Sequence, residues 1–405
     1  MPSTLPDGEP VPASGELPPA ALATVPGTPL SIYLHVPFCT TRCGYCDFNT
    51  YTASELGDAP GAGRAGYPDA VITELDQARR VLGDQVPAVG TVFVGGGTPT
   101  LLPADDLGRM LAAIRDRFGL APDAEVTTES NPESIDESGL RRLVDHGFTR
   151  ISFGMQSARQ HVLKVLDRVH TPGRPQQAVA EAKRAGFAQT SLDLIYGTPG
   201  ESLDDWRASL EAAVAAEPDH ISAYSLIVEP GTRLAARIRR GELPMTDDDD
   251  LADKYELAEQ LLSDAGYANY EISNWSTGPD TRCRHNLAYW HGHNWWGAGP
   301  GAHSHVGGVR WWNVKHPAAY AARLDQGVSP AQAREILTGD QQRVERVLLE
   351  LRLDTGLDPA VLTDRERARL PELVGRGLIG TDHDQLVLSP AGRLLADGVV
   401  RELLD

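Results

Sequence analysis

Short apolar runs alternate with longer amphipathic stretches along the chain from about residue 30 onward. Six runs have the length and β-branched composition of buried strands, at residues 30–36, 91–94, 125–129, 150–153, 191–196 and 220–226. Between them, apolar residues recur at the spacing of helices over 69–82, 105–118, 176–185 and 203–216. This alternation predicts right-handed βαβ units around a parallel sheet. We therefore expect an α/β fold with a partial (β/α)6 barrel over residues 29–240.

The remaining segments predict a less regular organisation. Residues 1–28 are rich in Pro, Ala and Gly without periodic apolar positions, so we expect a disordered leader. Residues 241–330 contain a Gly-, Trp- and His-dense stretch that we expect to close the barrel. Residues 331–405 read as short helices followed by a hairpin, which indicates a winged-helix-like C-terminal domain. Its balance of charges favours packing or partner docking over DNA reading.

Composition narrows the class of protein. At 405 residues and 41% hydrophobic the chain can bury a substantial core, and two or three domains are expected. The formal net charge of −19 disfavours nucleic acid as a partner, because a phosphate backbone would be repelled. The sequence shows neither a run of ~20 apolar residues nor a signal peptide, so we expect a cytoplasmic protein.

Three of the four cysteines lie within eight residues, at Cys39, Cys43 and Cys46, directly after the first predicted strand. Cysteine thiolates are the usual ligands of iron–sulfur clusters. With three thiolates, a [4Fe–4S] cubane keeps one iron without a protein ligand, and that iron can chelate the amino and carboxylate groups of S-adenosylmethionine (SAM). One electron from the cluster can then cleave the sulfonium to a 5′-deoxyadenosyl radical, chemistry that belongs to the cofactor.

Two other interpretations of the cysteines remain open. Zinc is one, since His35 lies four residues before Cys39 and a Cys3His set is chemically reasonable. Zinc ligands usually come as two separated pairs, however, whereas these residues crowd one loop. The other interpretation is three buried free thiols without a ligand.

The segment from Tyr33 through Cys39 and Cys46 to Phe48 resembles one branch of the radical-SAM superfamily. That branch contains oxygen-independent coproporphyrinogen III dehydrogenase and the HemW-type haem chaperones, and the resemblance extends from about residue 30 to the C-terminus. In the dehydrogenase a fourth cysteine follows two positions after the third. Phe48 occupies that position here, which favours the chaperone branch.

The resemblance also implies the residues that surround SAM. The glycine turn after the second predicted strand matches the SAM-binding turn of the family, and inward-facing polar residues of later strands match its contacts to the amino group, carboxylate and ribose. A carboxylate suits ribose hydroxyls and an arginine fork suits a carboxylate. The expected SAM contacts are Tyr33, Tyr45, Gly96, Gly97, Thr98, Glu129, Gln156, Arg168, Asp193 and Ile227.

Tryptophan and histidine are concentrated between residues 285 and 312. A packed aromatic lid over the barrel mouth is one explanation. A haem site is the other, since His is a common axial ligand. Within the stretch, His285-Asn-Leu-Ala-Tyr-Trp290 resembles the His-Asn-x-x-Tyr-Trp motif of HemW-type chaperones and implies bound haem, with His285 the best candidate ligand. Cys283 is an alternative haem ligand, and zinc among the later histidines, His291, His293, His303 and His305, also remains open.

Two functions follow from the resemblance. The favoured one is a haem chaperone that carries a [4Fe–4S] cluster and SAM and transfers haem to respiratory proteins, which we expect to be membrane-bound and docked transiently. The alternative is an enzyme, an oxygen-independent coproporphyrinogen III oxidase or dehydrogenase of porphyrin biosynthesis. The oligomeric state stays open, and a homodimer is one option.

Overall fold

The computed structural model of the protein describes residues 7–405, and its frame is one twelve-stranded sheet. The first six strands pair in sequence order and all run parallel. They are β1 (Leu30–Val36), β2 (Val89–Gly96), β3 (Leu120–Ser130), β4 (Arg150–Gln156), β5 (Gln189–Tyr196) and β6 (His220–Ser225). The six predicted strands and the α/β partial barrel are thereby confirmed.

Both edges of this parallel sheet are extended by later segments. The antiparallel strands β8 (Asn274–Ser276) and β7 (Ala268–Glu271) continue it beyond β6. Beyond β1, the order is β9 (Asn294–Ala298), β10 (His303–Val306), β11 (Val309–Asn313) and β12 (Ala331–Ile336). β9 is parallel to β1, which sequence periodicity did not predict. The sheet stays open, with β12 and β7 as its edges.

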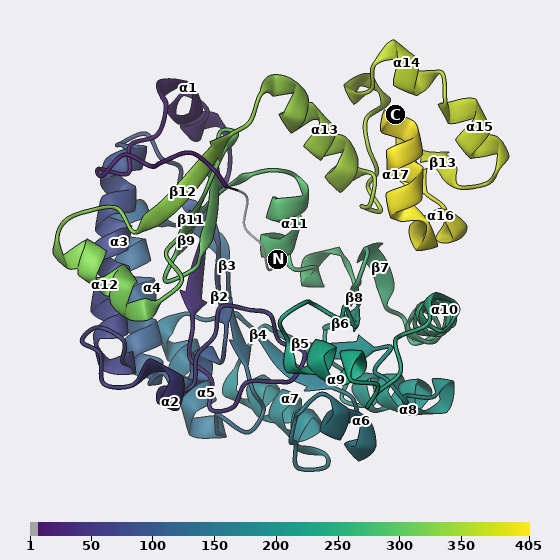
Figure 1. The fold of residues 1–405 in the computed structure, drawn as a ribbon, viewed down its shortest axis with the longest axis horizontal. Helices are drawn as coiled ribbons and strands as arrows, with labels where there is room; N and C mark the ends of the chain where they lie inside the picture. Colours follow the sequence, from purple (N-terminus) through teal and green to yellow (C-terminus); the bar gives the residue numbers. More distant parts are fainter. Residues whose placement is uncertain (1–6) are drawn as a thin grey trace.

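Helices cover the outer face of the sheet, as the arc from α3 to α8 in Figure 1 shows. Their bounds are α3 (Tyr67–Leu82), α4 (Ala104–Phe118), α5 (Glu137–His146), α6 (Gln160–Val165), α7 (Arg174–Ala185) and α8 (Leu203–Val214). Strand side chains alternate between faces. Ile32 and Leu34 of β1 are therefore buried in the apolar core, whereas Tyr33 and His35 point into the barrel.

The remaining α-helices lie at the barrel's flanks and in the C-terminal part. Those of the barrel and its flanks are α1 (Pro19–Leu22), α2 (Ala53–Leu56), α9 (Arg233–Arg239), α10 (Asp248–Asp264), α11 (Arg284–Trp290) and α12 (Pro317–Asp325). Those of the C-terminal part are α13 (Gly339–Glu350), α14 (Asp364–Arg367), α15 (Leu370–Gly375), α16 (Pro390–Leu394) and α17 (Ala396–Leu404). No helix within residues 7–405 combines the length and apolar character needed to cross a bilayer.

The expectation of a disordered leader is wrong for residues 7–28, while residues 1–6 lie outside the described part of the chain. Leu17, Ala21 and Val25 are buried in the main core. Glu9 forms an antiparallel bridge with Arg334 of β12 and an ion pair at 2.7 Å with its guanidinium. Long-range packing, which local composition does not report, orders this segment.

The C-terminal domain starts later than the predicted residue 331, because β12 belongs to the main sheet. From α13 onward the chain has its own apolar core, which includes Val347, Leu373 and Leu403. A separate two-stranded hairpin, β13 (Ile379–Asp382) and β14 (Gln385–Leu388), packs there among the helices. Figure 1 shows this domain beside the open side of the barrel, running from green at α13 to yellow at α17.

Candidate functional site

The cysteine loop follows β1 and is fixed to the neighbouring strand turn. Backbone hydrogen bonds join Gly97 N to Val36 O at 2.7 Å and Thr98 N to Phe38 O at 2.8 Å. A Cβ on Gly97 would lie 2.5 Å from Phe38 O, so only glycine permits this approach. The turn after β2 and the cysteine loop therefore form one unit at the carboxyl end of the parallel strands, where ligand sites of such barrels lie.

The three thiols fit an iron–sulfur cluster in chemistry and surroundings. Cys39, Cys43 and Cys46 are each partly exposed. Burial, reinforced by the neighbouring thiols, raises the pKa of Cys39, and it raises that of Cys46 to about 11. Such thiols need cations to become thiolates. Arg168 supplies one, with Nη1 3.5 Å from Cys43 Sγ, and its Nε is buried without a partner.

Zinc fits this loop less well than a cluster. Both ring nitrogens of His35 are engaged, Nδ1 with Tyr33 OH at 3.0 Å and Nε2 with Asn49 O at 2.9 Å. In residues 7–405, no three His, Cys, Asp or Glu side chains converge closely enough to hold a single metal ion. A cubane makes no such demand, because each thiolate takes a separate iron.

The later histidines do not form the alternative zinc site either. Both ring nitrogens of His305 are engaged, because Nδ1 donates to His293 O at 3.1 Å and Nε2 accepts the Gly308 N–H at 3.2 Å. His303 instead stacks on Trp312, with ring centroids 6.0 Å apart.

Two half-buried carboxylates lie close enough inside the barrel for the charge of one to act on the other. Glu129 at the end of β3 accepts the Gly96 N–H at 2.9 Å, and Asp193 of β5 accepts Ser152 Oγ–H at 2.8 Å. Burial, with a further contribution from Asp193, raises the pKa of Glu129 to about 7, and burial raises that of Asp193. Carboxylates with raised pKa values gain from a cationic or hydroxyl-bearing ligand. Their position suits the amino group and ribose of SAM.

Gln156 ends β4 in the left-handed region, with φ 60°, next to a β-bulge. Its Oε1 lies 3.2 Å from His170 Nε2, and Arg168 Nη2 donates to Gly154 O at 3.1 Å. The end of β4, the Arg168 guanidinium and the Cys43 thiol are therefore linked by direct contacts. The structure brings these expected SAM residues together.

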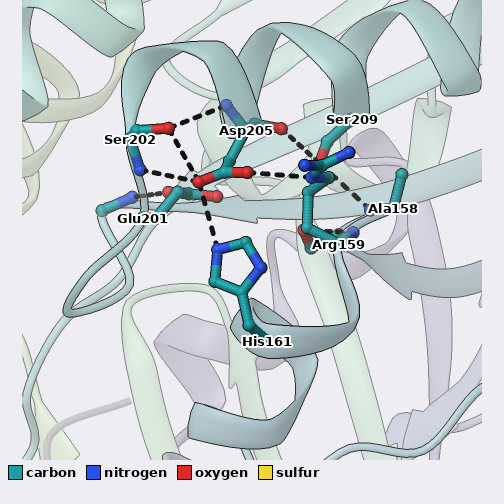
Figure 2. A network of polar contacts seen from close by, with 9 residues as sticks. Ala158, Arg159, His161, Glu201, Ser202, Asp205 and Ser209 are labelled. Carbon is teal, nitrogen blue, oxygen red and sulfur yellow. Dashed lines mark hydrogen bonds and ion pairs between the residues drawn. The ribbon is translucent and has the colours of Figure 1, made fainter.

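A polar clamp holds the turn that follows Gln156, as Figure 2 shows. Asp205 of α8 accepts Arg159 Nε–H at 2.8 Å and lies 3.1 Å from His161 Nε2. Ser209 Oγ accepts the Ala158 N–H at 3.0 Å. Hydrogen bonds from Ser202 and Arg159 hold the pKa of Asp205 at about 2, against the effect of its burial. The clamp keeps the turn against α8, starting two residues after the left-handed backbone of Gln156.

The remaining expected SAM contacts differ in their surroundings and in their exposure to solvent. Tyr33 points toward Glu129, whose charge adds to the burial that raises the pKa of its hydroxyl. Tyr45 packs against a small apolar cluster that includes Leu226 and Leu234. Ile227 directly follows β6 and is 66% exposed.

His285 was expected to be the haem ligand, but both nitrogens of its ring form hydrogen bonds inside the barrel. Nδ1 lies 2.7 Å from Thr91 Oγ1 of β2, and Nε2 lies 2.8 Å from Tyr289 OH. His285 is 1% exposed, and its ring stacks on that of Phe93 with centroids 5.2 Å apart. Burial lowers the pKa of His285 to about 3. In this arrangement His285 anchors α11 and has no nitrogen lone pair directed to a haem iron.

Cys283, the alternative haem ligand, is also enclosed. It is 2% exposed, and its Sγ lies 3.7 Å from Glu125 Oε1. Burial raises the pKa of this thiol to about 12. Glu125 additionally accepts the backbone N–H groups of Arg284 at 2.9 Å and His285 at 3.0 Å. It thereby caps α11 from β3, a role that the sequence analysis missed although a charged residue within a buried strand is itself a signal.

The same motif presents its other residues to a large groove. Asn286, Tyr289 and Trp290, at helical spacing on α11, line a groove of about 1550 Å³. Tyr224 of β6 and Tyr255 of α10 line it as well, and residues of the C-terminal domain form its far side. The aromatic lining suits a flat apolar ligand.

Comparison with known proteins agrees with the fold and the cysteine loop. A family model described as the radical SAM superfamily matches residues 33–213, which run from β1 into α8. Fold and site thus define a radical-SAM protein, a class whose cofactors are a [4Fe–4S] cluster and SAM.

Curated relatives identify the branch. The chain is 53% identical to the heme chaperone HemW of Mycobacterium tuberculosis, over 96% of this chain and 98% of that protein. It is 31% identical to HemW of Bacillus subtilis, over 91% of this chain and 97% of that protein. This chain therefore belongs to the HemW family. Among solved structures, coproporphyrinogen III oxidase (HemN) from Escherichia coli has the same fold, with a TM-score of 0.80 at 24% identity, covering 95% of this chain and 92% of that one.

Proposed function

We propose that this protein is a haem chaperone that binds a [4Fe–4S] cluster, SAM and haem, and that it transfers haem to respiratory proteins. The observation that carries the proposal is the position of α11. Its family motif presents Asn286, Tyr289 and Trp290 to a groove of about 1550 Å³. The relatives that match nearly the whole chain are named heme chaperones, which supports the same function.

Cys39, Cys43 and Cys46 would hold the cluster, which supplies an electron for SAM cleavage when both are bound. The chain's own contribution is positioning. Arg168 offsets the thiolate charge, and the half-buried carboxylates of Glu129 and Asp193 receive the amino and ribose groups of SAM. The full set of proposed SAM contacts is Tyr33, Tyr45, Gly96, Gly97, Thr98, Glu129, Gln156, Arg168, Asp193 and Ile227.

Haem would bind on the groove face of α11, and His285 would support that helix from behind. Trp290 and Tyr289 offer ring surface to a porphyrin, whereas both nitrogens of His285 are already hydrogen-bonded. The client would be a membrane-bound respiratory protein that docks transiently, and the chaperone would act in the cytoplasm, as a monomer or a homodimer.

Anaerobic haem titration of the cluster-reconstituted protein tests the function. We expect uptake of one haem per chain by the wild type and a clear loss in Trp290→Ala. Ile336→Ala, an exposed apolar change on β12 outside the groove, should behave as the wild type. Incubation with coproporphyrinogen III, SAM and a reductant provides the opposing assay. Formation of a vinyl-porphyrin product without stoichiometric haem uptake would refute the chaperone function and support the enzyme instead.

A further inference from the structure

The C-terminal domain is attached to the barrel largely through polar groups. Arg282 pairs with Asp354 through two bonds of 3.1 and 2.5 Å, and Asp354 N donates to Tyr270 O at 3.0 Å. Arg393 Nη1 donates to Asn269 Oδ1 at 2.9 Å. Ile272, from the β7–β8 turn, packs against the domain core. Beside these contacts, the groove lined by α11 remains open between the C-terminal domain and the barrel.

The domain side of the groove carries apolar side chains that face away from the domain core. Leu394, the last residue of α16, and Leu395, which follows it, are 38% and 56% exposed and both line the groove. Apolar side chains left in contact with water are less stable than buried ones, so covering them favours binding. The opposite wall holds the aromatic side chains of α11. A flat apolar ligand between the walls would cover both surfaces.

Positive charge in the groove lies on one side only. Arg352 and Arg393 lie on the C-terminal domain, where Arg352 contacts Asp397, itself a lining residue, and Arg393 lies 3.6 Å from Glu259 of α10. Each guanidinium has five N–H donors and can donate to a further carboxylate. The barrel side holds carboxylates without a cation among its lining residues: Asp248, Asp249, Glu256, Glu259 and Glu271. A ligand with two carboxylates would therefore direct them toward the C-terminal domain.

We propose that the C-terminal domain is the second wall of the haem site. The porphyrin ring lies between the aromatic face of α11 and the leucine pair, and its two propionates reach Arg352 and Arg393. This assignment rests on the proposed haem-chaperone function. It gives the small domain a direct part in holding the cargo, in addition to the family motif on the barrel side.

The leucine wall is tested by Leu395→Asp with Val374→Asp as the matched control. Val374 is 47% exposed on α15 of the same domain and does not line the groove. Leu395 is the N-cap of α17, a position that favours Asp, so the change should not unfold the helix. We expect haem affinity to fall at least tenfold in Leu395→Asp and by less than twofold in Val374→Asp. Iron content and SAM binding, measured alongside, should stay at wild-type values.

The propionate contact is tested with haem dimethyl ester, which lacks both carboxylate charges. Wild-type protein should prefer haem over the ester severalfold, and Arg393→Gln should reduce that preference while binding the ester as before. Equal losses for haem and ester would overturn the propionate assignment. Equal haem affinity of Leu395→Asp and Val374→Asp would overturn the second wall alone. Absence of haem uptake by the wild type would instead overturn the proposed function beneath it.

Discussion

Glu125 on β3 determines where the motif helix α11 begins, and removing its carboxylate tests this directly. In Glu125→Ala the backbone N–H groups of Arg284 and His285 lose the oxygens that now lie 2.9 and 3.0 Å away. Both donors are at the partly buried start of a seven-residue helix, which is too short to be stable without such support. The helix should open locally while the barrel remains folded.

The expected size follows from the two lost bonds. A hydrogen bond to a charged group contributes about 1.5 kcal/mol at the lower end of its usual range, so two contribute about 3 kcal/mol. At about 1.4 kcal/mol per factor of ten, the amides of residues 284–290 should exchange roughly 150-fold faster. Hydrogen–deuterium exchange followed by mass spectrometry measures this per peptide. Haem affinity should fall in the same variant, because Asn286, Tyr289 and Trp290 lose their fixed position.

Glu125→Gln provides the graded control, since its single amide oxygen can still accept one of the two N–H groups. It should give an intermediate rate of exchange. The reasoning is refuted if Glu125→Ala leaves exchange over residues 284–290 at the wild-type rate. Faster exchange across the whole barrel would also contradict it, because the role assigned to Glu125 is local.

Three further predictions address the cluster loop, the clamp and the buried histidine. Alanine at Cys39, Cys43 or Cys46 should abolish the brown iron–sulfur absorption and bound iron, whereas Cys283→Ala should keep both; wild-type iron in all three loop variants would exclude the assigned ligands. Asp205→Asn should weaken SAM binding about fivefold, the effect of roughly 1 kcal/mol lost from the clamp, at unchanged iron content. Asp204→Asn, at the exposed neighbouring position, should have no effect. Identical SAM affinities in the two variants would show that the clamp does not help to position Gln156 for SAM. For His285, the folded-state pKa of about 3 lies below the ordinary 6.5, so the unfolded chain binds the proton first and stability is lost as pH falls. Between pH 7 and 5 this contributes about 2 kcal/mol, so His285→Gln should show a correspondingly flatter decline in unfolding free energy by pulse proteolysis.

The barrel could be predicted because buried parallel strands are continuous apolar runs, and the helices between them repeat their apolar positions. The cysteine loop could be predicted because its ligands are neighbours in sequence. β9 could not, since Asn294–Ala298 is too short and too rich in Trp and Gly to show a strand period. Its place beside β1 depends on pairing across more than 250 residues.

The histidine of the family motif shows a second limit of sequence reasoning. Residue type identifies His285 as a capable ligand, but ligand capacity depends on which partners its nitrogens already have. Thr91 and Tyr289 occupy them, and Thr91 is 194 positions away in the chain. The groove could not be predicted for the same reason, because its walls come from α11, α10 and the C-terminal domain, which are separate in the sequence. Only the folded chain brings these together.

The contact between Glu9 and β12 has a consequence for how this protein should be handled. β12 is an edge strand of the large sheet, and the N-terminal segment bridges its outer side at Arg334. Unpaired strand edges are sites of self-association. A shortened chain that starts at residue 29 would uncover this edge together with the apolar surface now covered by Leu17, Ala21 and Val25. Trimming the Pro-rich start to favour crystals would therefore favour aggregates, and an affinity tag is better placed before the segment than in its stead.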